Sequence, residues 1–421
     1  MLEDTKTLRN IFVAWTLCFN DVLDANKLHA SLSSLLEIGD WRKVGGRLRL
    51  KDTGELEIHV PRPFTAERPA VSYTHQALPM DIGDHPLAKT LPKATEGPSI
   101  QPGPQGFPAF AAREDAPSTL QDFTSQDTPQ LSLRITSFND STLSEVPPML
   151  GAREDAICAA ADALMEKEEA FRLGQKQLRG LAMLKFGLRF AWDLLWNPVA
   201  ETHTIFLPEK AVAEAIWPSK EQCFISEGDV LTAWAMRAPR PATALHAINA
   251  RFRLSSLLQA PGVPVQNMAV AAFTFLSPEV ATGPLGPIAL ESRRCLTDQS
   301  TEAQVLAFLR ELRRESKSGS DPASVCGEPD ALLMPFTSWT RAGLFKAVDF
   351  GPALVRAGET GQSRSGPPGT VVFHHAQSLR ESPTARNAIE VLGKDHGNNY
   401  WLTGTLLPLA WAKIEENLNR M

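Results

Sequence analysis

Residues 336–353 read Phe336-Thr-Ser-Trp-Thr-Arg-Ala-Gly-Leu-Phe-Lys-Ala-Val-Asp-Phe-Gly-Pro-Ala353, and the rest of the chain can be arranged around them. Apolar and polar residues alternate at the start and at the end of the stretch, which predicts two half-buried strands. Trp339 and Asp349 stand out, because a buried indole needs a partner for its N–H and a buried carboxylate needs a cation or several donors. The stretch is therefore either a structural clamp or one wall of a functional site.

Length and composition indicate a globular protein with more than one core. A chain of 421 residues favours two domains of similar size. A hydrophobic content of 43% and a charged content of 21% are those of a soluble protein. The formal net charge of −6 argues against a nucleic-acid partner, which usually requires a basic surplus.

The cysteines and the apolar runs exclude several other classes. The five cysteines are odd in number and never form a Cys-x-x-Cys pair, which argues against a disulfide framework and a zinc site. The N-terminus lacks the apolar region of a signal peptide. The longest apolar run, 268–276, is too short to span a bilayer. We expect a cytoplasmic protein without a transmembrane segment.

Strand and helix patterns alternate in both halves of the chain, which predicts an α/β fold. The predicted strands are 11–19, 45–50, 56–60, 131–138, 203–207, 247–254, 266–276, 370–375 and 400–404. The predicted helices are 24–36, 160–196, a helix opened by the capping box at 226–229, 301–316 and 406–418. Residues 91–130 carry seven prolines, which indicates a long irregular segment that serves as a lid, a channel wall or a covering segment.

The predicted helix 160–196 has two distinct surfaces. One stripe is apolar and consists of Leu181, Leu184, Leu188, Trp192 and Leu195. The basic residues of the segment are Arg172, Lys176, Arg179, Lys185 and Arg189. We interpret the segment as an outer helix with a solvated basic face. A membrane-surface helix or a patch near an anionic cofactor is the alternative.

The motifs of the common nucleotide, zinc and serine-hydrolase sites are absent. The sequence contains no Gly-x-Gly-x-x-Gly, Gly-x-x-x-x-Gly-Lys-Ser/Thr, His-Glu-x-x-His or Gly-x-Ser-x-Gly. His374 and His375 are adjacent, and adjacent strand residues point to opposite faces, so we expect one buried and one exposed histidine and no shared metal ion. Residues 395–399 are predicted to form a turn.

Six segments occur in an order that resembles the BAHD-type (His-x-x-x-Asp) acyl-CoA-dependent acyltransferases, in particular the fungal branch of secondary metabolism. They are Trp41–Arg49, Asp84–Ala88, Leu131–Phe138, Ser226–Leu231, Asn249–Arg253 and Val348–Gly351. The resemblance runs through nearly the whole chain. It implies two chloramphenicol-acetyltransferase-like domains, each a mixed sheet with flanking helices, with a channel between them. We place the domains at 1–200 and 201–421.

The resemblance also implies a reaction. An acyl group would pass from acyl-CoA, as a co-substrate, to a hydroxyl or amine of a fungal secondary metabolite, with no bound cofactor and no metal. The expected partners are acyl-CoA and a small-molecule acceptor, and we expect a monomer. In the family a Trp and a Thr before the Asp-Phe-Gly strand lie in the channel, and Trp339 and Thr337 match them as oxyanion or channel candidates.

Asp349 and Gly351 match the family's Asp-Phe-Gly-Trp-Gly motif, in which the Asp is structural and pairs with an arginine. Arg251 and Arg253 are the two candidates for that arginine, in a charge-assisted pair. The motif's last two residues, Trp-Gly, are replaced here by Pro352-Ala353.

The family's general base has no counterpart in this sequence. None of the nine histidines is followed by an aspartate four residues on. The missing segment would follow the strand 131–138, so we predict a deletion between Leu143 and Ser144, from a spliced isoform, a gene-model error or a decayed relative. Loss of a base slows attack by an alcohol about 10²–10⁴-fold, which puts catalytic competence in doubt. The alternative is a non-catalytic binding protein that keeps the two-domain shell.

Overall fold

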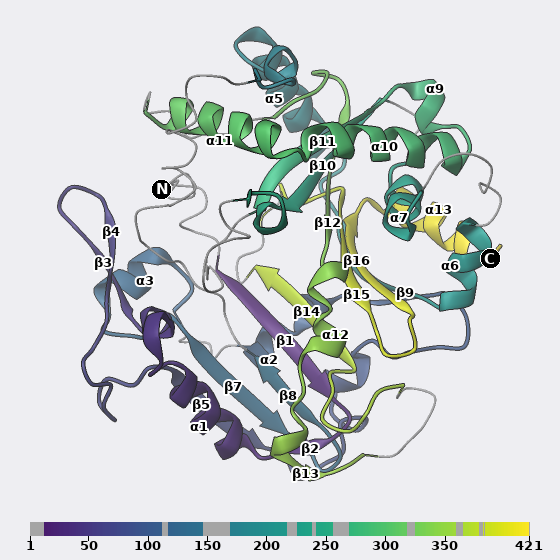
Figure 1. Cartoon of the computed structure of the whole chain (residues 1–421). Coiled ribbons are helices and arrows are strands. Elements are labelled where there is room, and N and C mark those ends of the chain that lie inside the picture. Colours follow the sequence, from purple (N-terminus) through teal and green to yellow (C-terminus); the bar gives the residue numbers. More distant parts are fainter. Residues whose placement is uncertain are drawn as a thin grey trace.

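The computed structural model describes residues 12–111, 117–145, 169–216, 225–237, 241–255, 269–317, 325–358, 365–378, 382 and 384–420. In this part of the chain the strands form one five-stranded sheet, one seven-stranded sheet and two small two-stranded sheets. In Figure 1 the five-stranded sheet lies in the lower half of the molecule, and the seven-stranded sheet lies above it and to the right.

The five-stranded sheet has β8 at its centre. Its order is β14 (Phe373–Ser378), β1 (Val13–Phe19), β8 (Thr142–Glu145), β7 (Ser132–Ser137) and β5 (Ser72–Ala77). Only the pair β5–β7 is parallel. Since β8 pairs with both β1 and β7, the junction of Leu143 and Ser144 lies inside a paired strand. The loop expected at 146–150 lies outside the described residues.

The seven-stranded sheet runs β11 (Ala269–Leu276), β10 (Ala242–Asn249), β12 (Leu332–Ser338), β15 (Ala388–Lys394), β16 (Tyr400–Leu406), β9 (Glu201–Leu207) and β6 (Ser99–Pro102). The pairs β10–β12 and β12–β15 are parallel, and the others are antiparallel. The strand predicted at 247–254 is misplaced. β10 ends at Asn249, because the Asn249 side chain accepts the Arg251 N–H and starts the 3-10 turn Ala250–Phe252.

The two faces of the seven-stranded sheet have different neighbours, since side chains alternate along each strand. On one face, Phe336, Ile389 and Leu402 pack with side chains of α7 (Glu227–Ala235) and α13 (Pro408–Leu418). On the other face, Leu392 and Trp401 pack into the core that contains residues of β1 and β14. The second face is therefore turned toward the five-stranded sheet.

Each large sheet contains one strand from the other half of the chain. β6 precedes residue 200 but pairs with β9, and β14 follows residue 200 but pairs with β1. The two sheets therefore interlock across the predicted boundary, and the division into 1–200 and 201–421 stays a prediction. The proline-rich segment 91–130 includes β6, and its Phe107 and Phe110 are buried in the core between the sheets, which fits a covering segment.

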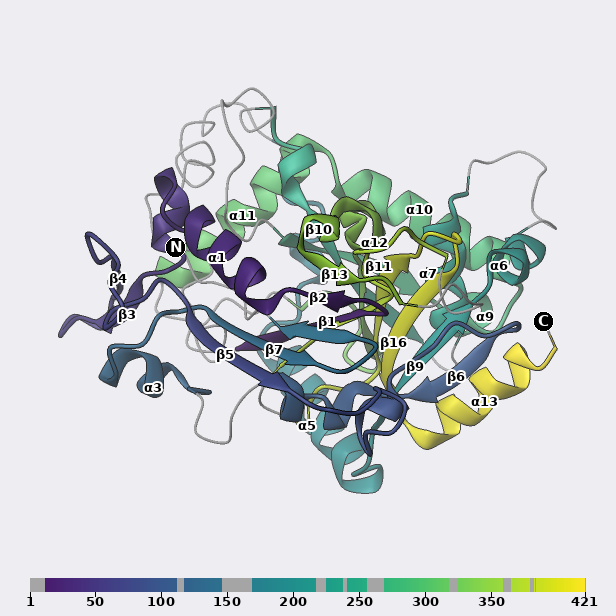
Figure 2. The ribbon, with the colours of Figure 1, turned by 90° about the horizontal axis from the view of Figure 1, so that it is seen from below.

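Two small sheets complete the strands of the described chain: β3 (Arg47–Leu50) pairs with β4 (Leu56–His59) as a hairpin, close to the two strands predicted there, and β13 (Leu354–Arg356) pairs with β2 (Val22–Leu23). The remaining helices are α1 (Ala25–Leu35), α2 (Pro108–Ala111), α3 (Leu120–Ser125), α5 (Leu181–Trp196), α6 (Glu209–Ile216), α9 (Pro278–Ala281), α10 (Leu285–Gln299), α11 (Glu302–Lys317) and α12 (Leu344–Ala347). Figure 2 shows α3 beside the hairpin and α13 near β6 and β9.

Helix α10 was not expected from the sequence, although it packs closely on α7 and β11. Two of its three buried residues, Ala289 and Ser292, are small, so the contact leaves a weak apolar pattern. The capping box of α7 is confirmed, because Ser226 and Asp229 exchange hydrogen bonds in both directions. Arg293 of α10 reinforces it by donating from Nε to Asp229 at 2.9 Å.

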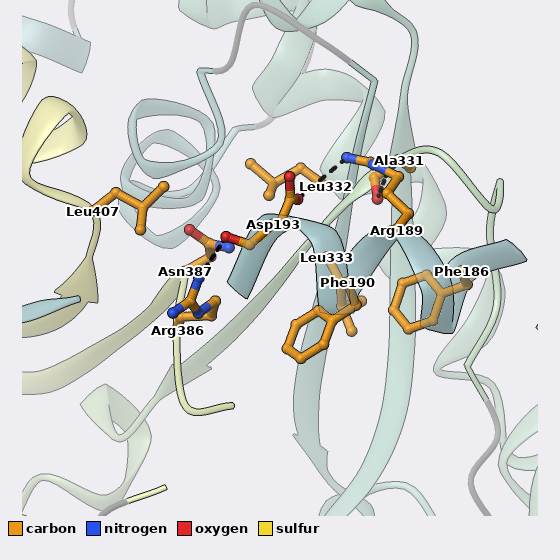
Figure 3. Close-up of a pocket in the computed structure, with 10 residues that line it drawn as sticks. All are labelled: Phe186, Arg189, Phe190, Asp193, Ala331, Leu332, Leu333, Arg386, Asn387 and Leu407. Atoms are coloured by element: carbon orange, nitrogen blue, oxygen red, sulfur yellow. Dashed lines mark hydrogen bonds and ion pairs between the residues drawn. The ribbon is translucent and has the colours of Figure 1, made fainter. Parts of the chain in front are cut away.

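Helix α5 corrects the prediction for 160–196. The helix starts only at Leu181, after Gly180 with a φ of +54°, and residues 160–168 lie outside the described chain. The apolar stripe does not face the core, since Leu181 is 83% and Leu195 72% exposed. The opposite side of the helix is held instead by Arg189, which donates to the carbonyl of Ala331 at 3.2 Å (Figure 3).

Candidate functional site

The stretch 336–353 is partly as predicted. Its start is the end of β12, but its end is not a strand. Residues 351–353 form a 3-10 turn, and β13 begins only at Leu354. The turn forms because the exposed carboxylate of Asp349 accepts the N–H of Gly351 at 2.8 Å. The polar–apolar alternation at this end of the stretch therefore belongs to a 3-10 turn and not to a strand.

Trp339 lies directly after β12 and contacts the five-stranded sheet. Its ring packs edge-on against Trp15 of β1, with ring centroids 5.9 Å apart and planes at 69°. Trp15 in turn donates its Nε1–H to Nδ1 of His374 at 3.5 Å. Trp339 thus joins a cluster of rings contributed by β1, β14 and the end of β12.

His374 and His375 are both buried, which corrects the expectation that one is exposed. Nε2 of His374 lies 3.1 Å from the carbonyl of Leu392, which assigns the proton to that nitrogen. Nδ1 of His375 lies 3.4 Å from the Thr403 hydroxyl. Both rings are covered, because His374 packs against the rings of Trp15 and Phe345, while His375 lies next to Thr403 of β16. Burial lowers the pKa of His374 to about 4 and that of His375 to about 3, so both imidazoles are neutral at pH 7.

The predicted ion pair between Asp349 and either Arg251 or Arg253 is not among the contacts that the structure records. The partner of Asp349 is the Gly351 N–H, and Arg253 donates from Nη1 to the carbonyl of Ser300 at 3.2 Å. Arg251 lies in the 3-10 turn after β10. Its pairing with Asp349, like that of Arg253, stays a prediction. A Cβ at Gly351 would meet the Asp349 Oδ1 at 2.8 Å, so a larger residue there would displace that exposed carboxylate.

A different carboxylate, Asp21, holds this region to the five-stranded sheet. It is fully buried after β1, and its two oxygens accept the N–H groups of Gly358 at 3.0 Å and Gly369 at 2.7 Å. The carbonyl of Gly369 accepts the N–H of Phe350 at 2.9 Å. Sequence reasoning missed Asp21 because Asn-Asp after a strand reads as a turn. Its position next to a buried strand was the available signal.

A row of polar side chains crosses the face of the seven-stranded sheet that is turned toward the five-stranded sheet. Thr337 of β12, Glu390 of β15, Thr403 of β16 and Thr204 of β9 are consecutive partners across the strands. Strand alternation puts them on the same face as Leu392 and opposite to Ile389. Burial raises the pKa of Glu390 to about 7. Sequence reasoning did not single out Glu390, because it did not identify β15 as a strand.

A pocket lies between α5 and the beginning of β12 (Figure 3). Arg386 is buried there and donates from Nη1 to the carbonyl of Asp193 at 3.4 Å. Arg189 lies 3.8 Å from the Asp193 carboxylate. The two cations are therefore balanced by Asp193 and by the carbonyl groups at the C-terminal end of α5. We assign the pocket to the attachment of α5.

The described residues offer no metal centre: they contain no cluster of three or more His, Cys, Asp or Glu side chains that could hold an ion. Cys18, Cys295 and Cys326 are free thiols. Within the same ranges, none of the helices has the length and apolar character needed to cross a membrane.

Comparison with known proteins identifies the family. The chain is 32% identical to the O-acetyltransferase PaAT-2 of Phomopsis amygdali, in an alignment that covers 100% of this chain and 96% of that protein. It is 31% identical to the acetyltransferase pyiB of Pyricularia grisea, with 100% and 92% covered. No protein-family model matches. The chain belongs to the family of fungal acetyltransferases that includes these two proteins.

The fold is confirmed by a solved structure. TRI101 of F. sporotrichioides, crystallised with coenzyme A and T-2, superposes with a TM-score of 0.63 at 14% identity, over 100% of this chain and 97% of that chain. The fold is that of the BAHD-type two-domain acyltransferases. The alignment with PaAT-2 extends over 478 positions, 57 more than the chain has residues, so at least that many positions have no counterpart here.

Proposed function

We propose that this chain transfers an acyl group from acyl-CoA to a hydroxyl or amine of a fungal secondary metabolite, more slowly than a family member with a His-x-x-x-Asp base. The 32% identity over the whole chain to an O-acetyltransferase carries the proposal. The TRI101 crystals contain both coenzyme A and a small-molecule acceptor, which supports the same pair of substrates for this chain. We further propose a cytoplasmic monomer.

The candidate site lies between the two sheets. Thr337 and Trp339 form the wall contributed by β12, where a hydroxyl donor can stabilise the oxyanion that develops on the thioester carbonyl. Asp349, Gly351, Arg251 and Arg253 have structural roles, in shaping the loop after β12 and the turn after β10. The acceptor oxygen attacks the thioester carbon, and the carbon–sulfur bond then breaks to release CoA.

The low rate follows from the missing histidine. The family's base segment follows the strand that matches β7, and we infer that a segment containing it is deleted at the junction of Leu143 and Ser144. The 57 unmatched positions in the alignment with PaAT-2 are consistent with a deletion of that size. We expect transcripts that cross this junction to encode an in-frame His-x-x-x-Asp segment in a longer isoform. A single continuous exon in genomic DNA would contradict this.

The direct test measures CoA release from acetyl-CoA by the purified chain with a panel of hydroxylated terpenoid and polyketide acceptors. We expect weak acceptor-dependent release that is lost in Trp339→Ala. Robust turnover that needs Trp339 would refute the low rate, and absence of any CoA binding by calorimetry would refute the acyltransferase proposal itself.

A second candidate function is supported by the same missing histidine. A chain that keeps the two-sheet shell without a base could bind CoA or a metabolite without turning it over. This predicts saturable binding in calorimetry together with no acceptor-dependent CoA release. Binding of neither CoA nor any acceptor would contradict it.

A further inference from the structure

Glu390 occupies the middle of the polar row between the two sheets. It is directly opposite Thr337 of β12 and Thr403 of β16. Neighbouring residues on adjacent strands lie about 5 Å apart, so the Glu390 carboxyl is within reach of a group bound against Thr337. Trp339 follows Thr337 by two residues on the same strand end. Glu390 is thus next to the wall assigned to the thioester.

The Glu390 carboxyl has no structural task that the described residues reveal. It forms no hydrogen bond or ion pair with any of them, although its side chain is only partly exposed. Buried carboxyl groups are usually paired, and an unpaired one on a sheet face that is turned toward a second sheet is a candidate for a functional role.

The groups that face Glu390 are neutral. β12 and β16 contribute Thr337 and Thr403, and β14 contributes His375, which is buried, uncharged at pH 7 and close to the Thr403 hydroxyl. His374 on the same strand is likewise neutral. Arg386, which precedes β15, donates to the carbonyl of Asp193. Burial without a neighbouring cation is the reason that the pKa of Glu390 is raised to about 7.

We propose, on the basis of the acyl transfer put forward above, that Glu390 is the catalytic residue that accepts the proton of the acceptor hydroxyl. The hydroxyl oxygen forms a bond to the thioester carbon while its proton moves to the Glu390 carboxylate. The carbon–sulfur bond then breaks, and the proton passes from Glu390 to the sulfur of CoA. The carboxylate is regenerated, so the step needs no other reactant.

A carboxyl with this acidity is suited to the role, since a general base is most effective when its pKa lies near the working pH. The buried histidines are poor bases by the same criterion, because their pKa values lie near 3 and 4. An acceptor with a hydroxyl matches this site better than a primary amine, because an ammonium group would hold its own proton more tightly than Glu390 does.

The test compares initial rates of acceptor-dependent CoA release for the unchanged chain, Glu390→Gln, Glu390→Asp and the control Glu328→Gln, in which an exposed loop carboxylate is replaced. We expect the rate of the unchanged chain to rise with pH around 7. Glu390→Gln should lower it about 100-fold and abolish that pH dependence, Glu390→Asp should retain the dependence at a lower rate, and the control should have no effect.

A measurement of CoA binding distinguishes failure of the proposed role of Glu390 from failure of the proposed acyl transfer. Calorimetry should give the same CoA affinity for Glu390→Gln as for the unchanged chain, which shows that the variant is folded. If Glu390→Gln binds CoA and keeps both its rate and its pH profile, the role of Glu390 is refuted and the acyl transfer stands. If the unchanged chain releases no CoA in response to any acceptor, both proposals are refuted.

Discussion

Replacement of Asp21 by asparagine should destabilise the protein by about 2–4 kcal/mol. The carboxylate is fully buried and accepts the N–H groups of Gly358 and Gly369 at 3.0 and 2.7 Å. Hydrogen bonds to charged groups contribute about 1.5–3 kcal/mol each. Asparagine keeps the size and one acceptor oxygen, but its NH2 group would face the second N–H and leave a buried donor unsatisfied, at a cost of about 1–3 kcal/mol.

The change should also be felt at the candidate site, because Gly369 holds the N–H of Phe350. Chemical denaturation monitored by tryptophan fluorescence measures the free energy of unfolding, and calorimetry measures CoA affinity. The matched control is Asp52→Asn, which alters an exposed turn and should change stability by less than about 0.5 kcal/mol. If Asp21→Asn loses no more stability than this control, the assignment of Asp21 as the residue that holds Gly358 and Gly369 to the five-stranded sheet is wrong.

Three further predictions concern the space between the sheets. Trp339→Ala should abolish CoA release but lower the free energy of unfolding by only about 1–2 kcal/mol, because it removes one edge-on ring contact with Trp15. The control Trp196→Ala, at a 71% exposed position, should leave both CoA release and stability unchanged. The pKa of His375 is about 3 in the folded chain and 6.5 for the free side chain, so the unfolded state binds more protons than the folded state below pH 6.5. The stability of the protein should therefore fall as the pH drops from 6.5 toward 3. In thermal unfolding, His375→Gln should reduce that fall. The effect of Glu390 on stability has the opposite pH dependence: its pKa is raised from 4.5 to about 7, so the folded state binds more protons between these values, and the stability that this group contributes falls as the pH rises through that window. Glu390→Gln should therefore raise the thermal midpoint relative to the unchanged chain at pH 8 but not at pH 4. An equal rise at both pH values would contradict the raised pKa.

The elements with strong local signals could be predicted from the sequence. Leucine spacing defines α1, the Ser226–Asp229 capping box opens α7, and a nearly continuous apolar run marks β1. The resemblance carried by scattered short segments predicted the two-domain acyltransferase fold, which the superposition with TRI101 confirms. These succeed because hydrophobic periodicity and caps depend on residues within one or two turns.

Other features depend on which segments meet, and the local pattern misled at each of them. The basic residues of 160–196 predicted a solvated basic face, but α5 exposes the apolar stripe Leu181–Leu195 and turns Arg189 toward the start of β12. The pair His374–His375 predicted one exposed ring, but β14 is covered on both faces. A side-chain period of 3.6 in a helix or 2 in a strand shows that the two faces of the element differ in polarity. The segments that pack against the element decide which face is buried.

The sequence by itself determined the class of the protein, its α/β pattern and the fact that none of the nine histidines is followed by an aspartate four residues on, because each of these is a matter of residue identity and short spacing. Only the tertiary structure decided that β6 and β14 exchange between the halves, that Asp21 holds the loop after Trp339, and that Glu390 lies between Thr337 and Thr403. Strand pairing and desolvation bring together residues that are tens to hundreds of positions apart, and no local pattern encodes those contacts.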